Sequence, residues 1–291
     1  MLKAETKGIL TTVFIAVIFF LLLGVVSLFA RIVFADHIKE YQLEAYCWTN
    51  AAAQLVLSIA IILVMRKTNV FNKQDFAVTT IGKGLWAGLV GVFYALFMFT
   101  INFFGNFSHV HSPDLSYLLA CVFIAFTTGL FEEVLIRGFT YKRFIKNIGY
   151  SVDGVKKSII WSSVLFGVMH IVNLSGYDLS SILTTTSQII SAVILGLFFA
   201  LVYLQSKSLW SVIILHSLID GATFVLYSLL SKEAFLPKSS EILTKWQIVL
   251  ESFIVPLVII MPFLIAVIVK WQKLKITLSG NEASKIEINP V

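Results

Sequence analysis

The sequence predicts an all-α membrane protein, a polytopic helical bundle with about eight transmembrane helices. Of its 291 residues, 58% are hydrophobic and 13% are charged, and the mean hydropathy is +0.91. Soluble domains have about 45–50% apolar and about 25% charged residues. Several apolar runs reach the roughly 20 residues needed to cross a bilayer core of about 30 Å. This composition excludes an ordinary soluble globule and a disordered chain. The two cysteines lie within apolar runs, which favours neither a disulfide framework nor a cysteine-based zinc site.

Eight apolar runs follow one another along the chain, separated by basic, polar or turn residues. Basic residues precede the first run and follow the second and the eighth, which marks the ends of these runs at the membrane surface. The turn between the fifth and sixth runs is very short, so these two could also form one broken hairpin. The predicted spans are residues 9–30, 45–65, 85–107, 115–136, 158–174, 179–204, 209–230 and 248–269.

The basic residues are distributed unevenly between the two sides of this bundle. With eight spans and a cytoplasmic N-terminus, five of the 22 Lys and Arg residues face outward and the other 17 face inward. This agrees with the positive-inside rule, so we expect both termini to be cytoplasmic. The asymmetry also explains the net charge of +6 without a nucleic-acid partner. Residues 1–275 are predicted to form one transmembrane domain, and residues 276–291 a polar cytoplasmic tail. The five outward-facing residues are Arg31, Lys39, Lys232, Lys238 and Lys245.

Ionisable side chains lie at membrane depth on three of the predicted helices. A charge at the centre of a membrane helix costs roughly 2.5–3.5 kcal/mol on insertion scales, so such residues mark functional sites by default. Measured from the basic residues at the cytoplasmic helix ends, Glu132 lies at a depth of about 15 Å and His170 at about 20 Å, at 1.5 Å per residue. His216 and Asp220 lie at about 14 and about 20 Å. We therefore expect these groups to share one slab in the cytoplasmic half to the middle of the bilayer, around one water-accessible cavity.

The spacing of these residues adds geometry. Glu133 and Arg137 are four residues apart with the acid first, the better order for an ion pair on a helix. His216 and Asp220 are also four residues apart and share a helix face. Glu132 is rotated by about 100° from its neighbour, so it can face the bundle interior while Glu133 pairs with Arg137.

Three short motifs carry a family resemblance. They read EEVLIR at residues 132–137, FGVMH at 166–170 and HSLID at 216–220. Their order and placement resemble the EExxxR, FxxxH and HxxxN or HxxxD motifs of the CAAX-protease and bacteriocin-processing family, also called the type II CAAX prenyl endopeptidase or Abi family. The resemblance covers residues 115–230, and the other spans match as generic transmembrane helices. Many members have Asn where this chain has Asp220. An ionised Asp cannot donate a hydrogen bond, so Asp220 must be protonated, act through His216 or have another role.

The resemblance implies an intramembrane endopeptidase and assigns roles to these residues. Glu132 and His170 would activate a water molecule, with Glu132 as the general base. His216, oriented by Asp220, would donate to the oxyanion. Glu133 and Arg137 would be structural or would orient the substrate, and Phe166 would pack beside His170.

A metal-dependent version of this mechanism is also possible from the sequence. A catalytic zinc ion takes three N or O ligands and a water, and His170, His216, Glu132 and Asp220 could supply them. The chain lacks the HExxH motif of many zinc proteases. Hydrolysis without a bound metal and zinc-dependent hydrolysis both stay open here.

The expected partners are the lipid bilayer and a membrane-associated or lipid-modified peptide or protein. A prenylated CAAX tail is the eukaryotic case. The composition favours a bacterial plasma-membrane protein, for which peptide pheromones, bacteriocin leaders or small membrane proteins are the expected substrates. The alternatives are a non-catalytic membrane protein that serves bacteriocin self-immunity or scaffolding and, less favoured, an ion-coupled transporter. The sequence shows neither the two-halves symmetry nor the paired broken helices typical of transporters.

Overall fold

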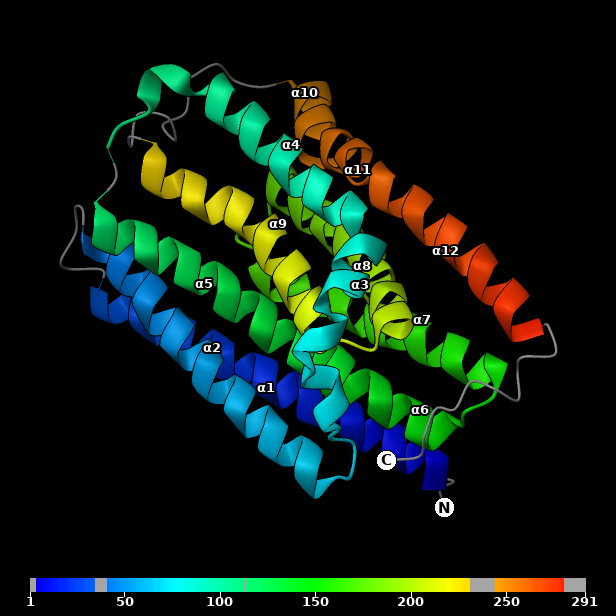
Figure 1. Ribbon diagram of the computed structural model, residues 1–291. Coiled ribbons are helices and arrows are strands. Elements are labelled where there is room, and N and C mark those ends of the chain that lie inside the picture. Colours follow the sequence, from blue (N-terminus) through cyan, green and yellow to red (C-terminus); the bar gives the residue numbers. More distant parts are fainter. Residues whose placement is uncertain (1–3, 35–40, 113, 231–243, 280–291) are drawn as a thin grey trace.

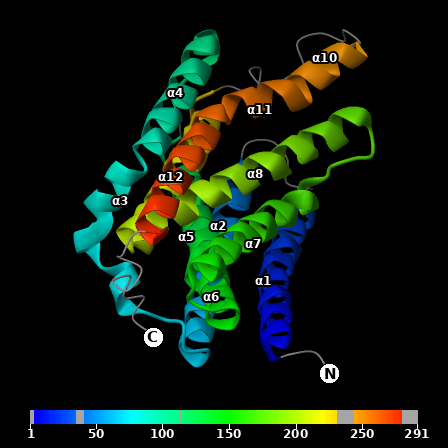
Figure 2. The ribbon, with the colours of Figure 1, turned by 90° about the vertical axis from the view of Figure 1, so that its right-hand side faces the viewer.

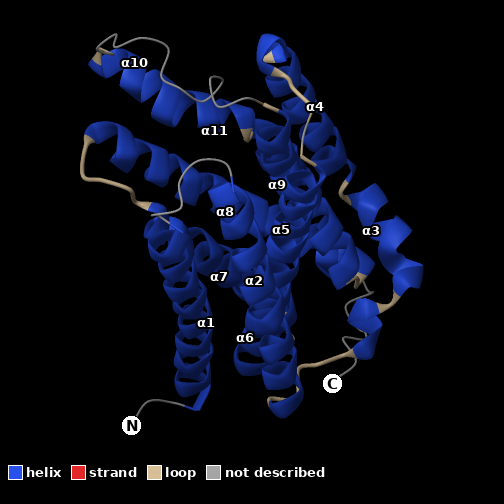
Figure 3. Ribbon diagram, turned by 90° about the vertical axis from the view of Figure 1, so that its left-hand side faces the viewer, coloured by secondary structure: helices blue, strands red, loops and turns tan. Residues whose placement is uncertain are grey.

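The computed structural model describes residues 4–34, 41–112, 114–230 and 244–279, which form helices joined by short loops (Figures 1 and 3). Seven described helices are long and apolar enough to cross a membrane, or eight if one sharply bent pair is a single span. The predicted class, an all-α polytopic bundle, is therefore confirmed. The α-helices are α1 (Ala4–Phe34), α2 (Tyr41–Lys67), α3 (Ile81–Ala87), α4 (Leu89–Gly105), α5 (Leu115–Glu133), α6 (Lys142–Ile148), α7 (Val152–Met169), α8 (Leu179–Ser206), α9 (Leu209–Leu229), α10 (Lys245–Val249), α11 (Val255–Ile259) and α12 (Met261–Ser279).

Several of the predicted spans are not continuous α-helices. The third is divided into α3 and α4, which meet at a bend of 70°. Gly88 lies at this bend, and a Cβ atom there would lie 2.1 Å from the Leu215 side chain. Glycine thus permits both the kink and the close approach to α9. The eighth span is interrupted at Ile260, just before Pro262, because proline cannot donate the helical hydrogen bond.

Helix α5 forms the centre of the bundle and packs extensively against α9 and α2. It continues through the π-helical segment Val134–Tyr141 into α6, and every residue from 129 to 141 is buried. Gly129 allows α9 to approach closely, since a Cβ atom there would lie 2.9 Å from the backbone oxygen of Ile213. Small residues at such interfaces let membrane helices pack by close contact. This central position surrounds the acidic residues of α5 with protein.

The outer helices have a different character. α1 and α12 lie on different sides of the bundle, and α1 begins and α12 ends toward the same end (Figure 2). Much of their apolar surface is exposed, which suits contact with lipid. If the bent pair is counted as one span, eight crossings place the two ends on one side, while the cytoplasmic orientation stays a prediction. Lys39, Lys232 and Lys238 lie outside the described residues, as does the predicted tail from residue 280 onward.

Candidate active site

The carboxylate of Glu133 lies at the centre of a buried cluster. The Arg137 guanidinium donates from Nη1 to Glu133 Oε1 at 2.8 Å, which confirms the ion pair expected from the spacing. Its Nη2 donates to the backbone oxygen of Gly196 on α8, also at 2.8 Å. The side chains of Glu133 and Arg137 are 0% and 1% exposed. The pair therefore neutralises two buried charges and joins α5 to α8.

Two aromatic rings enclose the guanidinium. Arg137 Cζ lies 5.0 Å from the ring centre of Phe166 on α7 and 5.4 Å from that of Phe199 on α8. Both distances allow cation–π attraction. Phe199 also stacks on the His216 ring, with centroids 5.1 Å apart and an interplanar angle of 21°. The aromatic residues thus fix the positions of a cation and an imidazole side by side.

His216 on α9 reaches both glutamates of α5. Its Nδ1 hydrogen-bonds to Glu133 Oε1 at 2.8 Å. Its Nε2 lies 3.5 Å from Glu132 Oε2 and 3.6 Å from Asp220 Oδ2, beyond the usual hydrogen-bond range. Asp220 therefore makes an ion-pair contact with Nε2, and its role in orienting His216 stays a prediction. The short bond comes from Glu133, because the close α5–α9 contact brings that carboxylate to Nδ1.

These contacts determine where protons must lie. Glu133 Oε1 already accepts from Arg137, so His216 Nδ1 is the donor in its bond to Glu133. The opposite nitrogen, Nε2, faces the carboxyl groups of Glu132 and Asp220. If neither carboxyl group nor Nε2 carried a proton, the two carboxylates would repel each other and the lone pair of Nε2. A proton on Nε2 or on a carboxyl oxygen converts one of these repulsions into an attraction. The Glu132, His216 and Asp220 side chains are therefore electrostatically coupled.

His170 lies at the end of α7, one aromatic ring away from this group. Its Nδ1 hydrogen-bonds to the backbone oxygen of Phe166 at 2.9 Å, and a carbonyl oxygen can only accept. Nδ1 therefore carries the proton, and Nε2 of the neutral ring is free to accept one. The Phe166 ring lies edge-on to both imidazoles, with centroids 5.0 Å from His170 and 6.1 Å from His216. Within the described residues, no direct polar contact joins His170 to Glu132 or His216.

The site is buried but not closed. The Glu132 side chain is 11% exposed and that of Asp220 is 25% exposed, whereas Glu133 is fully buried. One oxygen of Glu133, Oε2, is buried without a hydrogen-bond partner among the described groups. The accessible groups are thus those on the Nε2 side of His216.

The predicted metal ligands can be tested against this geometry. In the described part of the chain, no three His, Cys, Asp or Glu side chains come together in a way that would hold a metal ion. His216 Nδ1 is already bonded to Glu133, and the Phe166 ring packs edge-on against both imidazole rings. The side chains as placed do not fit a zinc site, so we derive no chemical step through a metal.

An apolar groove runs beside the site between α4, α5 and α9. Its volume is about 470 Å³, and Ala125, Ser217 and Gly221 are among the residues that line it. Ser217 and Gly221 directly follow His216 and Asp220 in the sequence, so the groove lies along the neighbouring face of α9. An apolar chain in the groove would therefore lie close to the polar cluster.

Comparison with known proteins agrees with the motifs. Residues 114–222 match the model of the family described as "Type II CAAX prenyl endopeptidase Rce1-like". No curated protein and no solved structure matches the chain. The matched segment contains all three motifs and the helices α5, α7, α8 and most of α9. Over residues 114–222 the chain is thus similar to the CAAX-protease family, as its sequence motifs predicted.

Proposed function

We propose that this protein is an intramembrane endopeptidase in which Glu132 activates a water molecule. The observation that carries the proposal is the convergence of Glu132, Glu133 and Asp220 on the single imidazole of His216. One carboxylate holds the ring while two others share its opposite nitrogen. That arrangement supplies a base, a proton donor and a fixed geometry, which are the requirements of peptide hydrolysis.

The proposed reaction proceeds in two steps. Glu132 removes a proton from a water molecule while the oxygen of that water attacks the scissile carbonyl carbon. His170 Nε2 helps to position the water. As the oxyanion forms, the His216–Asp220 pair donates a hydrogen bond to it through the proton that the two side chains share. The intermediate then collapses with cleavage of the C–N bond, and Glu132 returns its proton to the leaving amine. Glu133 and Arg137 do not exchange protons but hold His216 in place.

In this scheme Asp220 acts as a hydrogen-bond partner. A protonated Asp carboxyl can donate, as the Asn of many family members does. The 3.5 and 3.6 Å separations around Nε2 are long for direct bonds. They are suited to contacts that tighten around the substrate or are bridged by water.

The proposed substrate is a membrane-associated peptide that carries a lipid chain. The apolar groove along α9 offers a surface for such a chain beside the reacting groups. A peptide anchored in this way would present its backbone at the depth of Glu132, because the anchor and the polar cluster lie at neighbouring faces of one helix.

The test is a cleavage assay with the full-length protein in liposomes. We expect a farnesylated CAAX peptide to be cut and the same peptide without farnesyl to be cut more slowly. Glu132→Gln should reduce cleavage by about 10²–10⁴-fold, the usual contribution of a general base. Lys156→Ala, a surface change on α7, is the control and should cleave normally.

Two outcomes would count against this proposal. If Glu132→Gln retains full cleavage, Glu132 is not the base. If a chelator abolishes cleavage and zinc restores it, the metal-dependent version replaces the metal-free one.

A further inference from the structure

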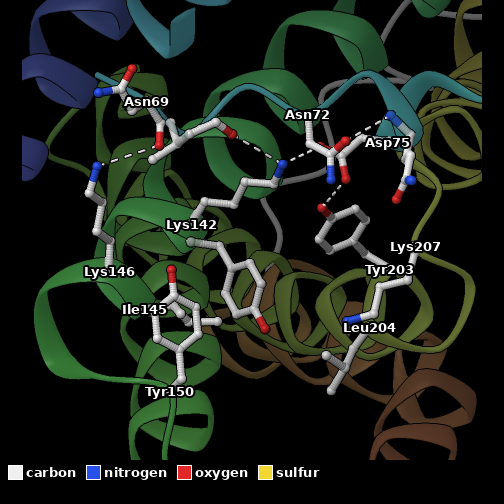
Figure 4. A pocket seen from close by; sticks show the side chains of 13 residues that line it. Asn69, Asn72, Asp75, Lys142, Ile145, Lys146, Tyr150, Tyr203, Leu204 and Lys207 are labelled. Atoms are coloured by element: carbon white, nitrogen blue, oxygen red, sulfur yellow. Dashed lines mark hydrogen bonds and ion pairs between the residues drawn. The ribbon is translucent and has the colours of Figure 1, made fainter. Parts of the chain in front are cut away.

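Helix α2 is attached to the rest of the bundle by different kinds of contact at its two ends. Where α2 ends, a second cavity of about 170 Å³ is lined by the following loop, α6 and the end of α8 (Figure 4). Asp75 of this loop is buried, accepts a hydrogen bond from Tyr203 Oη at 2.7 Å and forms an ion pair with Lys142 Nζ. Polar contacts between the loop, α6 and α8 therefore hold this end. The contacts of α2 nearer its beginning are made with α5.

These contacts show that α2 and α5 run side by side in the same direction. In the middle of α2, Gln54 accepts a hydrogen bond from Thr127 Oγ1 at 2.7 Å and donates one to Thr128 Oγ1 at 3.0 Å. Nearer the beginning of both helices, Ser116 Oγ donates to the carboxylate of Glu44. The partners in these contacts are 72 to 74 positions apart in the sequence. The register between the two helices is therefore nearly constant along their length.

This register places the two cysteines of the chain opposite each other. Cys47 on α2 and Cys121 on α5 are 74 positions apart, and their thiol groups lie within hydrogen-bonding reach of each other. The side chains are 3% and 0% exposed. They share a buried cluster with Ala51 and Ala120, whose small side chains let the helices approach closely. The pair thus has the facing side chains and the close backbones that a disulfide requires.

The cysteine pair lies near the membrane surface opposite the basic helix ends, which is called the outer surface below. Cys47 precedes Arg66 by 19 residues and Cys121 precedes Lys142 by 21, about 28 and about 31 Å at 1.5 Å per residue. These distances equal the thickness of the hydrocarbon core, about 30 Å. Trp48 beside the pair is 38% exposed, and tryptophan is typical of the membrane interface. The positive-inside rule predicts that this surface faces away from the cytoplasm, on the side where disulfides form and persist.

Packing alone does not explain why both residues of this contact are cysteines. A free buried cysteine acts as a small apolar residue with a weak hydrogen-bond donor, so an alanine at either position would serve the same purpose. The chain has two cysteines among 291 residues, and they meet at one contact between helices that are distant in the sequence. A covalent bond is the interaction that requires a cysteine on both helices.

We propose that Cys47 and Cys121 form a disulfide bond that joins α2 to α5 near the outer surface. The oxidant is a disulfide, of a protein or of a small molecule, on the outer side of the membrane. One cysteine thiolate attacks it and releases one thiol, and the second thiolate then displaces the other thiol from the mixed disulfide. The two cysteines lose two protons and two electrons, and the oxidant is reduced to two thiols. Because the folded pair is shielded from solvent, this exchange takes place before α2 and α5 close on each other.

The test determines the state of the thiols in the full-length protein. The protein is extracted from its membrane and denatured in the presence of N-ethylmaleimide, which blocks free thiols. The wild type should carry no maleimide before reduction and two after it. A digest made without reductant should contain the Cys47 peptide joined to the Cys121 peptide. Reduction should also lower the thermal midpoint by several degrees, because the disulfide restricts the unfolded chain.

Matched variants serve as controls for each readout. Cys121→Ala should take up one maleimide at Cys47 without reduction, and Cys47→Ala should take up one at Cys121. The double change Cys47→Ala, Cys121→Ala should have the same thermal midpoint with and without reductant. The thiol state is measured on the wild type, so a variant that fails to fold leaves the main result intact.

Three results would overturn the proposal. Two maleimide groups on the wild type before reduction would show that both thiols are free. A disulfide that joins two copies of the chain would show that the partners are not Cys47 and Cys121 of one molecule. An equal fall of the midpoint on reduction in the wild type and the double variant would show that the bond does not hold α2 to α5. None of these results depends on peptide cleavage.

Discussion

The two sides of His216 differ in burial and in how tightly their groups are bonded. On the Nδ1 side, Glu133 and Arg137 are fully buried, joined by 2.8 Å bonds and enclosed by aromatic rings. On the Nε2 side, Glu132 and Asp220 lie at 3.5 and 3.6 Å and are partly exposed. A tightly bonded charge is costly to disturb, and a loosely held one is free to change partners. This contrast leads us to expect different tasks for the two neighbouring glutamates of the EExxxR motif.

The largest expected effect comes from breaking the tight side. Glu133→Ala leaves Arg137 buried without its carboxylate, and losing one partner of a buried pair costs about 3–5 kcal/mol. The thermal midpoint in detergent should fall strongly, and cleavage should fall with it. The double change Glu133→Gln, Arg137→Gln should recover part of the stability, because it removes both charges. A single Glu133→Ala protein as stable as the wild type would contradict the role assigned to this pair.

A smaller effect is expected from the aromatic enclosure. Phe199→Leu removes the stack on His216 and one cation–π contact with Arg137, which together contribute about 1–2 kcal/mol. The thermal midpoint should decrease moderately, and cleavage should fall by less than about tenfold, since 1.4 kcal/mol corresponds to tenfold. Phe97→Leu on α4, where the side chain is 57% exposed, serves as a control that should change neither. Equal effects of the two substitutions would show that the stack is unimportant.

The smallest effect is expected on the loose side, at Asp220. If its carboxyl acts as a hydrogen-bond partner, Asp220→Asn should keep cleavage within about tenfold of the wild type with an unchanged thermal midpoint. The measurement is the initial rate of peptide cleavage in liposomes with and without a chelator. A loss greater than about 100-fold would mean that Asp220 must be charged, as a base or as a metal ligand would be.

Much of the site could be predicted because its residues repeat at helical spacing. The four-residue interval predicted the Glu133–Arg137 pair, and common membrane depth predicted that Glu132 and His216 would approach one another. The bond between Glu133 and His216 could not be found in this way, since 83 residues separate them and only the α5–α9 packing brings them together. Phe199 is likewise one of many phenylalanines in the sequence.

The breaks in the helices and the second cavity were harder to predict. The bend at Gly88 depends on the approach of Leu215 from α9, a contact that no local pattern contains. Asp75 lies in the segment between the second and third predicted spans. It is buried because Lys142 and Tyr203 from two other helices satisfy it. Local periodicity thus predicted the helices, whereas long-range packing determined the polar contacts.

The most direct measurement compares Glu132→Gln with Glu133→Gln in one preparation, recording peptide cleavage and thermal midpoint for each. Both substitutions replace a glutamate with a glutamine of the same size, and the two positions are adjacent. They differ mainly in which nitrogen of His216 the changed side chain faces. We predict that Glu132→Gln abolishes cleavage at an unchanged midpoint, whereas Glu133→Gln lowers the midpoint because Arg137 loses its ion pair. The contrary result, a Glu132→Gln protein that still cleaves or a Glu133→Gln protein of full stability and activity, would contradict the division of roles between the two glutamates.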